Sequence, residues 1–155
     1  DYLSQTNQYY KRYQIPNIEK HFGLLIEKSP YKNNNLELIR EFFFELKHEL
    51  LKRIEDDQQS WFPKIKRLSA NVHSQIPGFS LTSFLKDDPD PIEEKLNDLK
   101  SFFVLHLTGK YDLNLCYGVI FAIFSLEKDI KQNNRIRNRI LKPLYHLLQS
   151  AEFSN

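Results

Sequence analysis

Two stretches of the chain place polar residues where a helix would face its core. Arg53 and Asp57 are four residues apart in the first stretch, as are Asn133 and Arg137 in the second. Residues at this spacing share one face of an α-helix. Brought together in a core, carboxylate, amide and guanidinium groups could neutralise one another, and the carboxylate could also bind a metal. The repeated spacing therefore predicts paired, inward-facing polar groups.

Both polar pairs interrupt an apolar stripe, and each is followed by a proline at the same offset, Pro63 or Pro143. A charge on such a stripe is costly unless it is paired. A shift of register could instead put these groups at the edge of the seam, since most charged residues are exposed. Their repetition in two helices favours the inward orientation. The stripes are Leu46, Leu50, Arg53, Asp57, Trp61 and Ile65, and Ile123, Ile130, Asn133, Arg137, Leu141 and Leu144.

Helical periodicity dominates the sequence, and strand-like alternation is nearly absent. Short links within each half and a longer connection, 71–91, between the halves predict an all-α, up-down-up-down four-helix bundle. The repeated polar stretch predicts a pseudo-two-fold relation between halves at about 1–70 and 90–150. Pro16 should kink the first helix, and Asp90 should cap the third. The helices are expected at about 3–27, 36–68, 91–108 and 115–148.

The composition predicts one folded domain over residues 1–155. Of the 155 residues, 41% are hydrophobic and 14% aromatic, which suffices for one core. The 22 basic and 20 acidic residues leave a net charge of +2, so the sequence carries no signal for nucleic acid or an anionic membrane. With no apolar run of membrane-spanning length and no signal peptide, we expect a cytoplasmic protein. The absence of methionine predicts a processed, partly disordered or excised piece, and it leaves open whether a neighbouring domain is missing.

The remaining reactive side chains form no catalytic pattern. The one cysteine, Cys116, excludes an internal disulfide and is expected to pack in the core. The five histidines lack metal-binding spacing, although a relocated metal site with one histidine from each helix stays open. No phosphate loop, nucleophile elbow or serine triad is present, so no enzyme is predicted. Most aromatic residues are expected in the core: Phe42, Phe43, Phe44, Phe62, Phe102, Phe103, Phe121 and Phe124.

The order and spacing of these segments resemble the hemerythrin-like domain of the di-iron iron–sulfur cluster repair family. In that family the second and fourth helices each carry His-x-x-x-Glu, followed by a Leu-Phe-Pro-like segment. Similar runs occur at 45–50 (ELKHEL), 91–96 (PIEEKL) and 107–116 (LTGKYDLNLC), so the likeness covers about residues 9–148. The matching segments are Arg53-x-x-x-Asp57 before Trp61-Phe62-Pro63, and Asn133-x-x-x-Arg137 before Leu141-Lys142-Pro143.

The resemblance implies where a di-iron site would lie and that its ligands are replaced. The family binds its irons with imidazoles from all four helices and two bridging Glu carboxylates. Of the equivalent residues only Asp57 is an ordinary ligand, and arginine cannot coordinate a metal because it stays protonated. We therefore expect no cofactor, with iron as the alternative. The equivalent positions are Tyr10, Tyr31, Arg53, Asp57, Leu99, Asn133 and Arg137.

These positions predict a protein-only network in place of the metals. The two bridging-carboxylate positions should face each other, so we expect Asp57 and Arg137 to form a salt bridge across the core. Arg53 and Asn133 should add hydrogen bonds, and Tyr10 a hydroxyl group. Guanidinium groups would then replace the positive charge of the metals.

A degenerate metal site predicts a non-catalytic role, as a regulatory, sensory or protein-interaction domain beside an unknown partner or a neighbouring domain. The alternative is a di-iron or other metal-binding protein that takes part in iron–sulfur cluster repair or in the response to nitrosative or oxidative stress. A third reading is a small-ligand pocket in the space that the metals vacated. The oligomeric state is open, and a homo-oligomer is compatible with the sequence.

Overall fold

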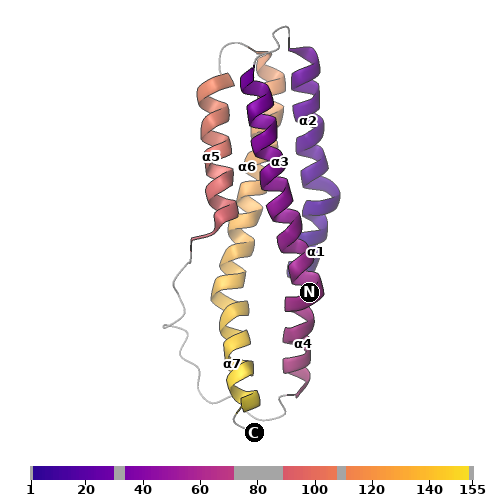
Figure 1. Ribbon diagram of the computed structural model, residues 1–155, viewed down its shortest axis with the longest axis vertical. Coiled ribbons are helices and arrows are strands. Elements are labelled where there is room, and N and C mark those ends of the chain that lie inside the picture. The colour runs from indigo at the N-terminus through magenta and orange to yellow at the C-terminus, as the bar shows by residue number, and fades with distance from the viewer. Residues whose placement is uncertain (1, 30–33, 72–88, 108–110, 154–155) are drawn as a thin grey trace.

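The computed structural model describes residues 2–29, 34–71, 89–107 and 111–153. All regular structure in these ranges is helical, and four helical rods pack against one another as a four-helix bundle (Figure 1). The segments η1, η2 and η4 are π-helical turns within the rods. The rods are α1 (Tyr2–Tyr9), η1 (Tyr10–Gln14) and α2 (Ile15–Lys28); α3 (Asn34–Asp56), η2 (Asp57–Trp61) and α4 (Phe62–Asn71); α5 (Pro91–Leu107); and α6 (Leu113–Ile136), η4 (Arg137–Leu141) and α7 (Lys142–Phe153).

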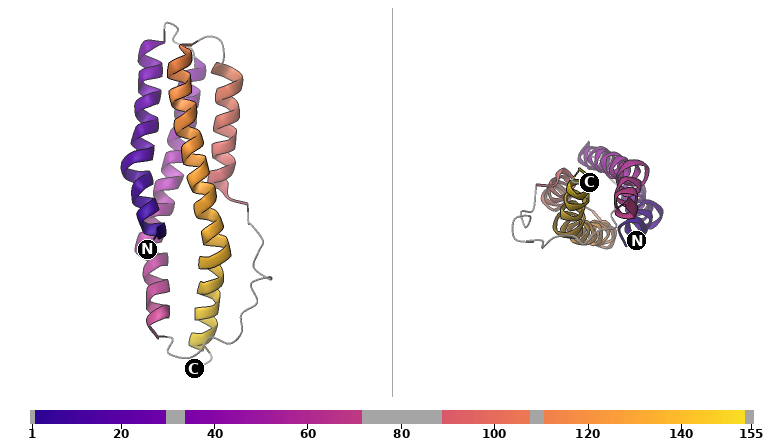
Figure 2. Two further views of the ribbon diagram at one scale, coloured as in Figure 1. Left: turned by 180° about the vertical axis from the view of Figure 1, so that it is seen from behind. Right: turned by 90° about the horizontal axis from the view of Figure 1, so that it is seen from below.

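Neighbouring rods run in opposite directions along the bundle axis (Figures 1 and 2). The helices form a closed ring in which α3 packs against α5, α5 against α6, α6 against α2, and α2 against α3. This order puts α3 and α6 at opposite corners of the bundle. Side chains that join their continuations, η2 and η4, must therefore meet across its centre.

The apolar stripe predicted for the second helix faces the core. Ile39, Phe43 and Leu46 of α3 are each no more than 1% exposed. The ring of Phe43 packs against Phe22 of α2, with centroids 5.4 Å apart, and Phe22 meets the edge of Phe103 of α5 at 6.1 Å. Burying each such side chain contributes about 1.5–3 kcal/mol. Aromatic rings thus tie three of the rods together.

Below the N-terminal end of α1, the described part of the bundle continues as two helices, α4 and α7 (Figure 1). These helices pack on each other around a small apolar cluster, separate from the main core. The π turns η2 and η4 immediately precede them, so both turns lie where α3 and α6 pass into this two-helix part. The cluster comprises Ile65, Leu68 and Leu148, with Trp61, Leu141 and Tyr145 packed against it.

Aspartates cap the N-terminal ends of α5 and α6. Asp90 accepts a hydrogen bond from the backbone N–H of Ile92 at 2.8 Å, which confirms the predicted cap of α5. Asp112 accepts from the backbone N–H groups of Asn114 and Leu115, at 2.9 and 3.1 Å. This second cap was not foreseen, and it starts α6 at Leu113 rather than near Leu115.

The prediction of a mostly buried aromatic set was wrong for three residues. Phe121 of α6 is 67% exposed, and Phe44 and Phe124 are each 41% exposed. An uninterrupted apolar run gives no periodicity with which to choose a buried face, so the neighbouring helices decide it. Leu144, placed on the inner stripe by its spacing, is also exposed. Among the described helices, none is both long and apolar enough to cross a membrane.

Candidate functional site

A π turn begins at a buried polar residue in three of the described rods. The residues are Tyr10 in η1, Asp57 in η2 and Arg137 in η4. In each turn the carbonyl of that residue accepts a hydrogen bond from the backbone N–H five residues later. Such turns are rare and often mark functional sites. All three residues are among the positions that the sequence analysis singled out.

Prolines explain where the π turns form. Pro16, Pro63 and Pro143 each follow the first residue of a π turn by six positions. A proline has no backbone N–H, and its ring clashes with the carbonyl four residues before it, so the preceding α-helical turn must widen. The expected kink at Pro16 is therefore a π turn. The sequence analysis matched only the two later prolines, although a polar residue six positions before each proline was a readable signal.

Asp57 and Arg137 form the ion pair that the sequence predicts, across the centre of the bundle. Arg137 donates to both carboxylate oxygens of Asp57, with 2.7 Å between Nη1 and Oδ2. The side chains of Arg137 and Asp57 are only 8% and 5% exposed. Asn7 of α1 donates a further hydrogen bond to Asp57 Oδ2 at 2.8 Å, and the Arg137 guanidinium lies over the Trp61 ring at 4.9 Å. The carboxylate is thus satisfied from two sides.

The positive charge of this pair is held in a poorly hydrated place. Burial lowers the pKa of the Arg137 guanidinium, and the charge of nearby Arg53 lowers it further, whereas Asp57 raises it. Arginine nevertheless stays protonated at neutral pH, because its ordinary pKa is so high. The charge of Arg53, in the last turn of α3, therefore acts on the charge of Arg137 at the start of η4.

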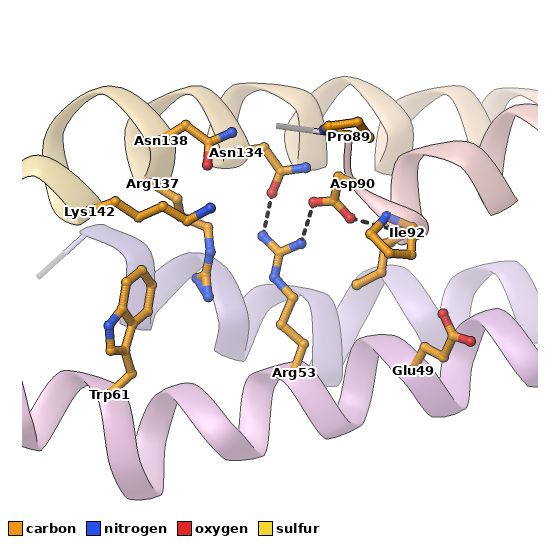
Figure 3. A pocket seen from close by; sticks show the side chains of 11 residues that line it. Glu49, Arg53, Trp61, Pro89, Asp90, Ile92, Asn134, Arg137, Asn138 and Lys142 are labelled. Atoms are coloured by element: carbon orange, nitrogen blue, oxygen red, sulfur yellow. Dashed lines mark hydrogen bonds and ion pairs between the residues drawn. The ribbon is translucent and has the colours of Figure 1, made fainter. Parts of the chain in front are cut away.

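Arg53 adds hydrogen bonds, as expected, but to residues outside the Asp57–Arg137 pair. Its guanidinium donates instead to Asp90 Oδ2 at 2.7 Å and to the side-chain oxygen of Asn134 (Figure 3). Asn134 in turn donates to Glu93 of α5 at 2.7 Å. Arg53 therefore fastens the start of α5 to α3 and α6. Neither residue type nor spacing links Asn134 or Asp90 to Arg53, so these contacts were not predicted.

Asn133 and Tyr10 form the other polar contact that was expected. The Asn133 amide donates to the Tyr10 hydroxyl at 3.3 Å, and both residues are 1% exposed. Burial raises the pKa of Tyr10 to about 12, since the phenolate would be poorly solvated. Within the described part of the chain, the side-chain oxygen of Asn133 has no hydrogen-bond donor.

The two remaining predicted positions add no polar group here. Leu99 is fully buried in the apolar core cluster. Tyr31 lies outside the described residues. Gln14, at the end of η1, was not foreseen, and it donates to Asp129 of α6 at 2.7 Å.

We call Tyr10, Arg53, Asp57, Asn133 and Arg137 the polar layer, and these residues do not fit a di-iron centre. Both oxygens of Asp57 accept from a guanidinium, which brings a fixed positive charge and no lone pair to the site. Nowhere in the described residues do three or more His, Cys, Asp or Glu side chains gather as metal ligands. His48, His106 and His146 are exposed, and His21 is half-buried.

A pocket of about 380 Å³ opens beside this layer, next to the start of α5 (Figure 3). Arg53, Arg137 and Lys142 reach into it from three elements. Trp61 forms one wall, and Asp90 lies at the opposite side. Two of the residues that the resemblance equates with metal ligands, Arg53 and Arg137, therefore line a cavity.

No protein-family model, no curated protein and no solved structure matches this chain.

The structure shows the four-helix bundle. The hemerythrin-like resemblance rests on the sequence pattern alone.

Proposed function

We propose that the chain is a single, metal-free hemerythrin-like domain that acts in the cytoplasm as a non-catalytic regulatory, sensory or protein-interaction module. The observation that carries this proposal is the buried Asp57–Arg137 pair between η2 and η4. In the family pattern these are bridging-carboxylate positions. The guanidinium of Arg137 at one of these positions neutralises the Asp57 carboxylate at the other, as a metal ion would. The matching π turns also support a pseudo-two-fold relation between the halves of an up-down-up-down bundle.

The chemistry of the layer favours binding over catalysis. Asp57 is held by Arg137 and Asn7, so its oxygens are not free to accept a proton from a substrate. The buried Cys116 thiol is no better as a nucleophile, because burial and then the charge of Asp112 raise its pKa and disfavour the thiolate.

Metal analysis tests the proposal. We expect the purified chain, loaded with ferrous iron and then desalted, to retain well below one iron per chain, because the layer offers one carboxylate and no imidazole. Elemental analysis and the absorption spectrum provide the measurement. Retention of about two irons per chain, with an oxo-bridged absorption band, would establish the alternative, a di-iron protein of the cluster-repair type. Zinc-loaded protein provides the control for adventitious binding.

An interaction role is supported by an exposed apolar stripe on α6. Leu113, Tyr117, Phe121 and Phe124 recur every three or four residues and therefore share one face. They are 56%, 50%, 67% and 41% exposed. The Tyr117 and Phe121 rings lie 6.2 Å apart, so they form one continuous surface. Contiguous apolar surface of this kind usually marks an interaction site.

We infer that the stripe docks a second copy of the chain. Exposed Asp112 lies just before the stripe and exposed Lys128 one turn after it. Two copies of α6 that pair antiparallel about a two-fold axis near residue 119 would bring each aspartate towards the lysine of the other copy. Tyr117 and Phe121 of one copy would then pack against the same residues of the other copy, as an isologous interface requires. The opposite charges of Asp112 and Lys128, at the two ends of the stripe, are therefore complementary in an antiparallel dimer.

Sedimentation velocity over a concentration series tests this surface. We expect the parent chain to dimerise, and Phe121→Lys to raise the dissociation constant at least about tenfold, because a charge would enter the apolar centre. Lys128→Glu should weaken the dimer less. Leu38→Lys, at a 52% exposed site on α3, is the matched control and should leave the dimer intact. A monomeric parent, or equal effects of the Phe121 and Leu38 variants, would refute the inference.

A further inference from the structure

The pocket beside the π turns has an uneven charge distribution. Its described lining includes three cationic side chains and two carboxylates. Arg53, Arg137 and Lys142 gather between Trp61 and Asp90, whereas Glu49 lies towards the far end (Figure 3). Glu49 Oε1 forms an ion pair with Lys95 Nζ at 2.9 Å, and Asp90 forms an ion pair with Arg53. Three cationic side chains therefore meet next to Trp61, and two of them, Arg53 and Arg137, are already paired with Asp90 and Asp57.

The two guanidinium groups retain hydrogen-bond capacity towards the pocket. A guanidinium has five N–H donors. Among the described residues, Arg53 donates to Asp90 and Asn134, and Arg137 donates twice to Asp57. Each group thus has N–H donors left over at the edge of a cavity. The half-buried side chain of Asn138 lines the same wall.

An anion in this pocket would relieve a repulsion within the protein. After burial, the charge of Arg53 contributes to the lowered pKa of Arg137, so the two guanidinium groups repel each other. A bound oxyanion would lie near both charges and accept from their remaining donors. Charge-assisted hydrogen bonds from a partly buried arginine are among the stronger polar contacts, and arginine forks fit phosphate and carboxylate groups.

We propose that this pocket binds a small oxyanion, a phosphate or carboxylate group, through Arg53, Arg137 and Lys142. The volume of about 380 Å³ fits a small metabolite rather than a macromolecule. This inference rests on the proposed sensory role and names the class of ligand that the module senses. The guanidinium groups at two former ligand positions then serve as an anion receptor, one of them also holding Asp57 and the other the start of α5.

Trp61 supplies a specific probe, because it lines the pocket and is the only tryptophan in the sequence. Iron-free protein is titrated with inorganic phosphate and, separately, with succinate, at constant ionic strength set by chloride. We expect a saturable change in tryptophan fluorescence. Lys142→Gln and Arg53→Gln should each weaken binding at least about tenfold, through loss of a charge-assisted contact. Lys20→Gln removes the same charge from an exposed site on α2 and should change the affinity less than about twofold.

Circular dichroism establishes which variants fold. If Arg53→Gln unfolds because α5 loses its anchor, Lys142→Gln carries the test. Saturation by phosphate alone specifies a phosphate ligand, and saturation by succinate specifies a dicarboxylate. The absence of a saturable change with either anion overturns the inference, as does equal weakening by Lys142→Gln and Lys20→Gln. Either failure leaves the metal-free module standing, whereas only the iron-loading experiment can overturn that.

Discussion

Replacing Arg137 by alanine is expected to lower the free energy of unfolding by about 3–5 kcal/mol. The substitution removes both hydrogen bonds from the guanidinium to Asp57, whose side chain is 5% exposed. The remaining hydrogen bond, from Asn7, cannot compensate a buried negative charge. Urea denaturation monitored by circular dichroism at neutral pH measures the loss.

Arg135→Ala is the matched control, because Arg135 is exposed and only two residues away on the same rod. It should change the stability by less than about 0.5 kcal/mol. The double variant Asp57→Asn with Arg137→Leu should recover most of the loss, since it removes the stranded charge and leaves an amide oxygen for Asn7. If Arg137→Ala unfolds at the same urea concentration as the parent, the pair is not a structural element of the core.

Alkaline pH should destabilise the chain through Tyr10. Burial raises its pKa from 10.0 to about 12 in the folded state, so the folded protein holds this proton more tightly than the unfolded chain. The contribution to stability is complete below pH 10 and is lost as the pH rises towards 12. At 1.36 kcal/mol per pKa unit, it amounts to about 2–3 kcal/mol.

Tyr10→Phe isolates this effect from the other groups that titrate at high pH. Between pH 10 and about 12, the parent should lose about 2–3 kcal/mol more than the variant. Denaturation curves at several pH values, together with tyrosinate absorbance, provide the measurement. Tyr13→Phe, at a 63% exposed site in the same π turn, controls for the substitution and should cost less than about 0.5 kcal/mol at neutral pH. Parallel stability curves for parent and Tyr10→Phe would contradict a buried phenol.

Local periodicity was enough to locate the rods and to orient the polar residues. The stripe of α3 faces the core as its spacing predicts, and Asp57 and Arg137 continue the inner faces of their rods. Their pairing was also predictable, because opposite charges at equivalent inner positions of two helices can meet only across the centre. The π turns were within reach of the sequence too, since a proline follows each of them at a fixed distance.

The contacts of Arg53 were not within reach of the sequence. Its type and spacing match those of a residue that joins Asp57, yet it binds Asp90 and Asn134. Which residues Arg53 binds depends on where α5 begins along the bundle axis relative to α3. Packing between the rods sets that position. The pocket arises for the same reason, because it opens between the start of α5 and the residues of η4 and α7 that follow α6.

The sequence by itself determined the helices, their inner faces and the opposed charges at two of the π turns. These features follow from interactions between residues close along the chain, where spacing alone decides which side chains share a face. Only the tertiary structure decided that Asn7 supports Asp57, that Arg53 anchors α5 and that Phe121 is exposed. Each of these features depends on how the separate rods are shifted along the bundle axis and rotated relative to one another. Side-chain packing between rods fixes both, and no pattern within a single helix encodes them.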